Sequence, residues 1–441
     1  MDYLEWQYIQ IALSIALFCL SWITIWRMRI SWDKVPFIWV LIGYGLLSAI
    51  SNLLRWERFD HTALRIITEA EYTQATLWWC ASLSVSVAVY LWLLGHSRRW
   101  VWKYQSSSNA ASSYRLRFYV GASVFLVVLY ALNPFRTKDF NILMPQSLSE
   151  MAIGGLLVSA FIVNTLATVA VCLLRYKFPI GLLAISLVTW LYTHSGSKGM
   201  SAMYLLYLAT VVWRHRYQIR LGVLSWLLIL GLLVFITIAL PLGVKSRYGG
   251  SYSFIEAAAI AVGRYTQQDV SAVLWSFSEW REAFAKSYVV DNLLSFFPGF
   301  LFAGKPMNPA YAINALYFGG GGPISAASPS LFGAILIVTQ EWLYWPVLLL
   351  TLIIIYKLDT FFCRHPQVRV LRFDYEWLYF YTLMVLFEAT FVIAFGQLLI
   401  VFVWRQFLSR QSKTTSVPGR ESGPVLPLTR FQQSSHFSQR R

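Results

Sequence analysis

The residues best suited to chemistry are basic side chains beside apolar segments in the middle of the chain. Lysine offers an anion a point charge and arginine offers it a bidentate fork, so a group of such cations could hold phosphate. Solvated loop charges, or anchors at helix ends, are the alternative interpretation. The candidates are Lys198 in SGSKG, Lys245 and Arg247 in VKSRYGG, Arg264 in GRYTQQD, Arg281, and Lys305 in FAGKP.

Acidic residues are few in the same part of the chain, and three of them are candidates for a general base. Asp269 follows Arg264 by five residues, so a salt bridge between these two is the simpler interpretation. Glu388 lies within the apolar run VLFEATFV, where an ionisable residue predicts a functional site or else marks an exposed tight turn. Glu341 is the third candidate, near the outer end of another apolar stretch.

Two glycine-containing segments could add backbone N–H groups to the candidate anion-binding residues. Four consecutive glycines at 319–322 leave N–H groups open to a ligand, or form a hinge. SGSKG at 195–199 is either a tight turn or a helix start that suits an anion. In SPSLFG, Ser328 or Ser330 would cap a following helix, and Ser328 is a further candidate for substrate binding. The four cysteines lie far apart and no spacing resembles a metal site, so we expect no metal and no cofactor.

Long apolar blocks must position these residues. The chain of 441 residues is 57% hydrophobic and 13% charged, about half the charged fraction of a soluble domain. Blocks of about 15–25 apolar residues are long enough to cross about 30 Å of hydrocarbon. We therefore expect an all-α polytopic membrane protein with about eleven spans, ten to twelve being possible, near 7–26, 35–54, 76–95, 118–134, 151–174, 178–193, 200–213, 221–243, 329–357, 375–388 and 391–407. The stretch 329–357 is long enough to be tilted or to begin as a short interfacial helix.

The distribution of basic residues predicts the orientation. The net charge is +16, but its clusters follow apolar spans, as the positive-inside rule requires, and this argues against a nucleic-acid partner. Examples are Arg98-Arg99 and the stretch 214–216, whereas the acid-containing segment 55–75 is nearly neutral. The N-terminus is therefore expected outside and the C-terminus in the cytoplasm.

Four regions follow from this pattern. Residues 1–243 form about eight N-terminal transmembrane helices, and residues 329–407 form the C-terminal ones. Residues 244–328 form a large extracytoplasmic loop, in which aromatic residues at helical spacing predict short interfacial helices. Loops of this length are usually functional. The Ser-, Gln-, Pro- and Arg-rich tail 408–441 is expected to be disordered.

The order of these motifs resembles a known family. SGSKG at an outer helix junction, a large periplasmic loop, PGFLFAGKP, a glycine-rich segment and SPSLFG entering a membrane helix are similar to the bacterial O-antigen/oligosaccharide repeat-unit polymerases (Wzy type). These belong to one superfamily with the O-antigen ligases, and the likeness covers roughly residues 180–360. Two positions depart from the pattern. Ala334 stands where the family often has Glu, and Lys198 where relatives often have Arg.

The resemblance implies a glycosyltransferase of the bacterial inner membrane. Its substrates, as donor and acceptor, would be glycans linked to undecaprenyl pyrophosphate, and a chain-length regulator and a flippase would be partner proteins. Arg264, Arg247 and Lys305 would contact the pyrophosphate, with Lys198, Lys245 and Arg281 in support. The base would be Asp269, Glu341 or Glu388. A ligase that transfers finished polymer to another acceptor, and a transporter of the same lipid-linked glycan, are the alternatives.

Overall fold

The computed structural model is helical throughout the part of the chain that it describes. That part comprises residues 3–28, 35–56, 67–96, 113–136, 146–176, 178–194, 253–254, 267–285, 287–294, 329–339, 341–364, 376–387 and 398–399, with single residues at 30, 204, 208, 238, 241, 313, 394, 396 and 402. No strand occurs in these ranges. The expected all-α architecture is therefore confirmed for the described residues.

Long apolar helices dominate the described ranges. Three are long and apolar enough to cross a membrane: α1 (Tyr3–Arg27), α3 (Glu69–His96), and α15 (Glu341–Asp359) with the π-helical turn η4 (Thr360–Arg364) that continues it. Shorter apolar stretches lie in α2 (Pro36–Trp56), α4 (Ser113–Leu132), α5 (Gln146–Tyr176) and α6 (Phe178–His194). These helices and α16 (Glu376–Phe387) coincide with eight of the expected spans. The spans expected at 200–213, 221–243 and 391–407 lie mostly outside the described residues.

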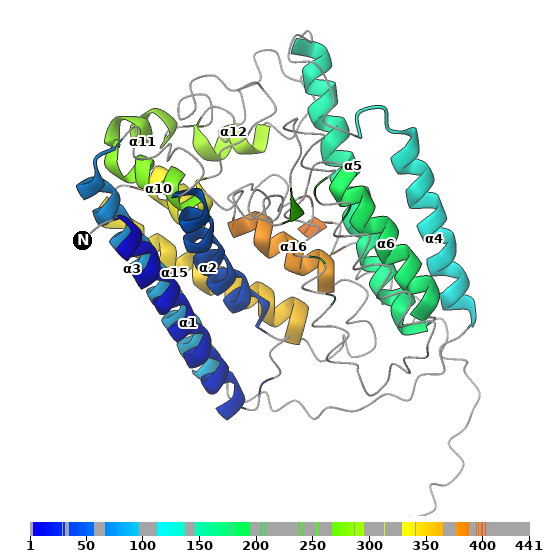
Figure 1. The fold of residues 1–441 in the computed structure, drawn as a ribbon, viewed down its shortest axis with the longest axis horizontal. Coiled ribbons are helices and arrows are strands. Elements are labelled where there is room, and N and C mark those ends of the chain that lie inside the picture. The colour runs from blue at the N-terminus through cyan, green and yellow to red at the C-terminus, as the bar shows by residue number, and fades with distance from the viewer. Residues whose placement is uncertain are drawn as a thin grey trace, which may run out of the picture.

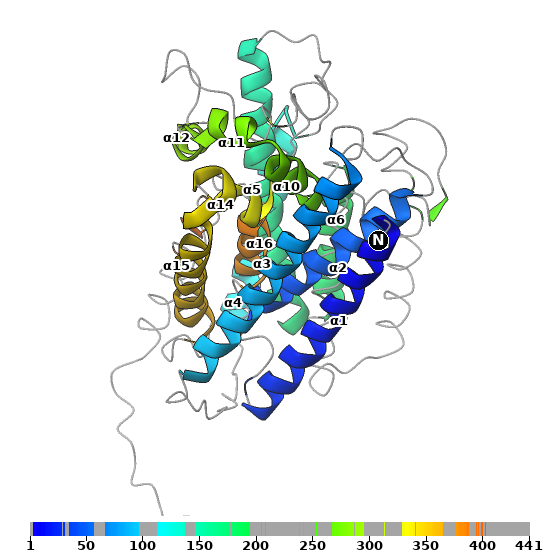
Figure 2. The ribbon, with the colours of Figure 1, turned by 90° about the vertical axis from the view of Figure 1, so that its left-hand side faces the viewer.

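The helices form two groups with α16 between them (Figure 1). Helices α1, α2, α3 and α15 pack together on one side, α4, α5 and α6 pack together on the other, and α16 contacts both α2 and α5. The turned view shows α1 and α3 running side by side in the same direction (Figure 2). Helix α1 lies at the periphery and exposes large apolar side chains such as Phe18 and Trp22, as expected of a helix that faces lipid.

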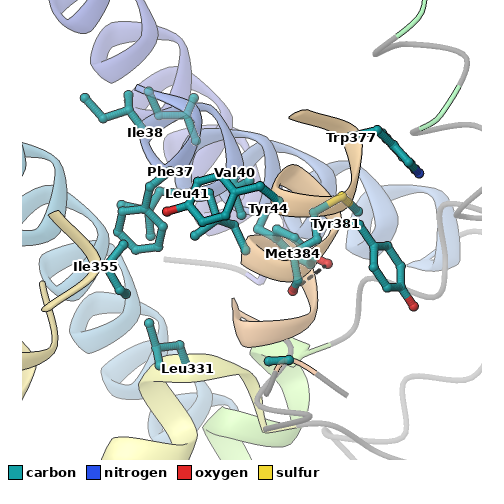
Figure 3. Close-up of a cluster of buried hydrophobic side chains, with 14 of the residues drawn as sticks. Phe37, Ile38, Val40, Leu41, Tyr44, Leu331, Ile355, Trp377, Tyr381 and Met384 are labelled. Atoms are coloured by element: carbon teal, nitrogen blue, oxygen red, sulfur yellow. Dashed lines mark hydrogen bonds between the residues drawn. The ribbon is translucent and has the colours of Figure 1, made fainter. Parts of the chain in front are cut away.

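One large apolar core joins α2, α14 (Ser330–Val338), α15 and α16 (Figure 3). Phe37, Val40 and Leu41 project from α2 towards Ile355 of α15, and each is at most 1% exposed. The Tyr44 hydroxyl donates a hydrogen bond to the backbone carbonyl of Met384 on α16 at 3.5 Å. Close packing of this kind fixes the middle of the bundle, against which the more polar ends are positioned.

Helix α3 begins seven residues before the expected span at 76–95 because a capping box lengthens it. Thr68 precedes the helix, and its hydroxyl accepts a hydrogen bond from the Glu71 N–H at 3.3 Å. The Glu71 carboxylate in turn accepts hydrogen bonds from the Thr68 N–H and hydroxyl at 2.7 and 2.8 Å. This reciprocal arrangement satisfies two helix-end donors. The added turns bring Tyr72 into the helix, where its side chain is buried.

The stretch 329–357 is two helices and not one. Helix α14 ends at Val338, Thr339 is extended, and α15 begins at Glu341. Residues Ser330 to Ile337 of α14 are all buried among other helices. The stretch thus begins with a short separate helix, whereas the position of that helix relative to the membrane interface stays a prediction. The N-cap of α14 is Pro329, and Ser330 is its first residue, with a left-handed φ of 61°. Such a backbone is uncommon outside glycine and costs free energy, so the surrounding contacts must hold it in place.

Three short helices are described in the expected extracytoplasmic loop: α10 (Gln267–Ser276), α11 (Ser278–Ala285) and α12 (Tyr288–Leu294). Helix α10 does not lie on the surface. Its residues from Gln268 to Leu274 are buried, and it packs against α3 and α14 at one end of the bundle. This burial places a polar stretch of the loop inside the protein.

Candidate functional site

Asp269 of α10 is the centre of the candidate site. Its carboxylate is 1% exposed and accepts a hydrogen bond from the Tyr72 hydroxyl of α3 at 2.9 Å. The Gln7 side chain of α1 donates to the same hydroxyl at 3.4 Å. Asp269 also lies in the first turn of α10, where the positive end of the helix dipole favours a negative charge. Of the two candidate bases that the structure describes, Asp269 and Glu341, Asp269 is thus the one in a buried polar setting.

Gln268 forms a second polar layer directly beside the first. Its Oε1 accepts hydrogen bonds from the Gln10 amide at 2.8 Å and from the Ser48 hydroxyl at 3.0 Å. Its amide nitrogen donates to the Thr76 hydroxyl at 3.4 Å. One side chain therefore links α10 to α1, α2 and α3. Gln10 and Thr76 lie one turn below Gln7 and Tyr72 on their helices, so the two layers are stacked along the helix axes.

Helix α14 closes the other side of α10. The Ser271 hydroxyl donates to the Pro329 carbonyl and lies 3.1 Å from the Ser330 hydroxyl. The Ser330 hydroxyl also accepts a hydrogen bond from the Gly333 N–H at 3.3 Å. A side-chain carbon at Gly333 would lie 2.8 Å from Ser271 Oγ, so only glycine permits this approach of the two helices. The left-handed Ser330 is thereby held by α10.

The environment of Ala334 is apolar. It is 1% exposed and belongs to a cluster with Val270 and Leu274 of α10, Tyr288 of α12, Ile313 and Ile337. A carboxylate at this position would be buried among hydrocarbon groups at a large free-energy cost. The acid that the resemblance leads one to expect at Ala334 therefore has no polar setting here, whereas Asp269 on the facing helix has one.

An aromatic wall lies next to the polar layers. The Trp78 ring of α3 stacks on Trp275 of α10, with centroids 4.9 Å apart, and contacts Tyr344 of α15 at 5.2 Å. The Tyr344 hydroxyl lies 2.7 Å from the Ser82 hydroxyl. Stacked and tilted aromatic pairs stabilise their packing beyond the area they bury. This wall fixes α10 against α3 and α15.

Two predicted site residues pair with each other. Arg281 of α11 donates to the Glu341 carboxylate at the start of α15 at 2.9 Å. The Arg281 side chain is 13% exposed and the Glu341 side chain is 66% exposed. An exposed pair contributes at most about 1 kcal/mol. Arg281 would have to exchange this partner before binding phosphate, and Glu341 faces solvent, away from the buried layers around Asp269.

The other predicted residues lie outside the described part of the chain. They are Lys198, Lys245, Arg247, Arg264, Lys305, Ser328 and Glu388, together with the SGSKG and four-glycine segments. Within the described ranges, no three His, Cys, Asp or Glu side chains lie close enough to hold a metal ion.

Sequence reasoning overlooked the buried polar residues of α1 that bond Tyr72 and Gln268 beside Asp269, although a signal for them was present. Gln7 and Gln10 interrupt an apolar span at helical spacing, and both are fully buried. Polar side chains inside such a span pair with other helices or line a functional cavity. The pairing of Gln10 with Gln268, and that of Gln7 with Tyr72, could not be read from the sequence, because 258 and 65 residues separate the partners.

A second buried carboxylate was also overlooked. Asp359, the last residue of α15, is fully buried and accepts hydrogen bonds from the hydroxyls of Tyr90 on α3 and Tyr379 on α16. The π-helical turn η4 follows it directly, and π-helical segments often occur at functional sites. Asp359 and Asp269 contact opposite ends of α3.

The chain matches no family model, and searches of curated proteins and of solved structures find no match either.

Proposed function

We propose that the protein is a polymerase of lipid-linked oligosaccharide repeat units, with Asp269 as its general base. In this proposal the chain spans the bacterial inner membrane with its N-terminus outside, and the end of the bundle that carries α10 faces the periplasm. The observation that supports it best is the buried Asp269–Tyr72 pair. It presents a carboxylate on a helix of the loop to which the family resemblance points.

The reaction joins two glycans that are each carried on undecaprenyl pyrophosphate. A hydroxyl of the acceptor attacks the anomeric carbon of the donor, a new glycosidic C–O bond forms, and the C–O bond to the pyrophosphate breaks. Asp269 takes the proton of the attacking hydroxyl, and undecaprenyl pyrophosphate leaves with the electron pair of the broken bond. The developing negative charge on the pyrophosphate is stabilised by cations, for which Arg264, Arg247 and Lys305 remain the candidates.

The role of Tyr72 follows from its contact. Its hydroxyl bonds the carboxylate of Asp269 and so orients the oxygen that receives the proton. Because Asp269 is 1% exposed, the acceptor reaches it only when α10 moves away from α3. The ion pair between Arg281 and Glu341 joins α11, which directly follows α10, to the adjoining end of α15, but its Glu341 side chain is exposed and the pair therefore adds little to the free energy that holds α10 in place.

The test uses the purified full chain in lipid vesicles with an undecaprenyl-pyrophosphate-linked oligosaccharide as both donor and acceptor. Longer glycans should form and be visible as a ladder on a gel. Asp269→Asn should abolish elongation while the protein remains folded, because asparagine keeps the size and can still accept from Tyr72 but cannot take the proton. Tyr72→Phe should reduce elongation, and Glu341→Gln should leave it nearly unchanged.

Other outcomes separate the alternatives. If Asp269→Asn elongates like the wild type, Asp269 is not the base. Transfer of preformed polymer to lipid A, without elongation, would identify a ligase. Movement of the lipid-linked glycan across the vesicle membrane without any new bond would identify a transporter.

A further inference from the structure

Helices α1 and α3 run in the same direction, and their contacts show which residues lie at the same level. Gln7 of α1 bonds Tyr72 near the start of α3. Near the end of α3, a side-chain carbon at Gly95 would lie 3.2 Å from Met28, the residue after α1. The two helices therefore lie side by side from one end to the other (Figure 2).

Helix α15 accompanies α3 in the same direction. The ring of Tyr344, in the first turn of α15, has its centroid 5.2 Å from that of Trp78 of α3. Asp359, the last residue of α15, accepts a hydrogen bond from the hydroxyl of Tyr90. Helix α15 therefore begins beside the first half of α3 and ends beside its last turns.

Exposed tryptophan and tyrosine side chains on these three helices gather near the two ends. The first group consists of Tyr8, Trp342 and Trp345. Tyr8 directly follows Gln7, and both tryptophans lie within two residues of Tyr344. This group is therefore at the end of the bundle that carries α10.

The second group consists of Trp22, Trp26 and Trp92. Trp26 lies two residues before Met28, and Trp92 lies two residues after Tyr90. These two tryptophans are therefore at the opposite end of the bundle, and Trp22 is one turn further in.

The large hydrophobic side chains exposed between the two groups are of a different kind. They are pure hydrocarbon, for example Ile15 and Phe18 on α1 and Leu350 on α15. Tyr8 and Trp26 are eighteen residues apart on α1, a rise of about 27 Å, close to the hydrocarbon thickness of about 30 Å. Tryptophan and tyrosine gather at the boundaries of a bilayer, because their rings are apolar and their N–H and O–H groups require polar partners.

Helix α12 adds an independent observation near the first group. It lies at the same end of the bundle, across the direction of α1 and α3 (Figure 1). Its Val289 and Val290 are 49% and 54% exposed, although both are apolar. A short helix in this orientation, with apolar side chains exposed, is suited to the boundary layer of a bilayer.

We propose that the two groups are aromatic belts at the two surfaces of the bilayer, and that the candidate site lies in the first belt, at the depth of the lipid headgroups. Gln7 and Tyr72 connect this belt to the site, because Gln7 is next to Tyr8 and Tyr72 bonds Asp269. The surface between the belts contacts lipid tails. A polar group that stays attached to a lipid thus reaches the level of Asp269 without entering the hydrocarbon. This depth follows from the exposed side chains and does not rest on the proposed reaction.

The experiment measures depth with nitroxide spin labels on the full chain in vesicles of phosphatidylethanolamine and phosphatidylglycerol. Each label is attached to a single cysteine, and the other cysteines are replaced by alanine. Oxygen concentrates in the hydrocarbon and a nickel chelate stays in water, so the ratio of their effects on the relaxation of the label rises with depth. The labelled positions on α1 are the exposed native Cys19 and Tyr8→Cys. On α15, Trp342→Cys and Leu350→Cys form a matched pair, because both positions are exposed on one helix.

The label at Cys19 should lie about 16 Å deeper than that of Tyr8→Cys, because eleven residues separate the two positions. The label of Leu350→Cys should lie about 12 Å deeper than that of Trp342→Cys, from a separation of eight residues. Val290→Cys on α12 should be level with Trp342→Cys. Size-exclusion chromatography reports whether each variant is folded, and Trp345→Cys with Ile353→Cys, also eight residues apart, replaces a pair that does not fold.

Equal depths within either pair overturn the proposal. It is also overturned if neither oxygen nor nickel reaches the label of Leu350→Cys, because protein and not lipid would then cover this face. Free access of nickel to the labels at Cys19 and in Leu350→Cys would place the face in water, with the same consequence. The measurement needs no substrate, so this proposal and the proposed function can fail separately.

Discussion

Removing the Gln268 side chain tests whether the second polar layer holds α10 in place. In Gln268→Leu, Ser48, Gln10 and Thr76 each lose a hydrogen bond to this residue. Side-chain hydrogen bonds between membrane helices contribute about 0.6 kcal/mol on average, and buried bonds in general about 0.5–1.5 kcal/mol. The variant should therefore lower the free energy of unfolding by about 2–3 kcal/mol.

A double-mutant cycle with Ser48→Ala isolates one of these bonds. Alone, Ser48→Ala should cost about 0.6–1 kcal/mol, because its hydroxyl donates to Gln268 Oε1 at 3.0 Å. In the Gln268→Leu background it should cost nothing, because the acceptor is already absent. The expected coupling free energy is therefore about 0.6–1 kcal/mol.

The assay is reversible unfolding in mixed micelles with a rising mole fraction of dodecyl sulfate, followed by tryptophan fluorescence. All four proteins of the cycle are compared at the same protein and detergent concentrations. A coupling free energy below about 0.3 kcal/mol, the ordinary error of additivity, would refute the contact between α2 and α10.

Three further predictions follow from local geometry. Glu341→Gln should change the free energy of unfolding by less than about 1 kcal/mol, because its ion pair is exposed, and high salt should remove even this difference. Gly45→Ala should destabilise the bundle by about 1–3 kcal/mol, because its new side-chain carbon would lie 2.6 Å from Leu83. Gly43→Ala should not destabilise it, because there is open space around this position. The thermal unfolding midpoints of the two variants compare them directly. Tyr379→Phe should cost about 1–3 kcal/mol by removing one donor from the buried Asp359, and an unchanged unfolding midpoint in dodecyl sulfate would contradict that contact.

The helices were largely predictable from the sequence, because apolar length alone identifies a segment that fits a bilayer. The observed helix bounds differ from the expected ones where polar contacts or local backbone geometry determine where a helix begins or ends. The capping box of Thr68 and Glu71 starts α3 early, and the extended Thr339 divides the stretch after Pro329 into two helices. Neither effect appears in a hydropathy pattern.

The candidate site was predictable only in part. Asp269 was identified by its residue type and position, and it lies in a buried polar cluster. Its partner Tyr72 comes from a distant helix, 197 residues earlier in the chain. Arg281 and Glu341 were predicted separately, but their pairing depends on how α11 meets α15. Contacts between distant segments depend on the whole packing arrangement, which no local pattern encodes.

The position of Gln268 has a consequence for how the protein is made. Its three partners, Gln10, Ser48 and Thr76, precede it by 258, 220 and 192 residues. At about 5–20 residues per second, at least about 10–40 s pass between the synthesis of Thr76 and that of Gln268. During this interval α1, α2 and α3 are already available for insertion, while their polar side chains lack the partner that completes them. The nascent bundle is thus a distinct folding intermediate whose polar side chains still lack hydrogen bonds to Gln268, and these bonds form only when α10 packs against α1, α2 and α3.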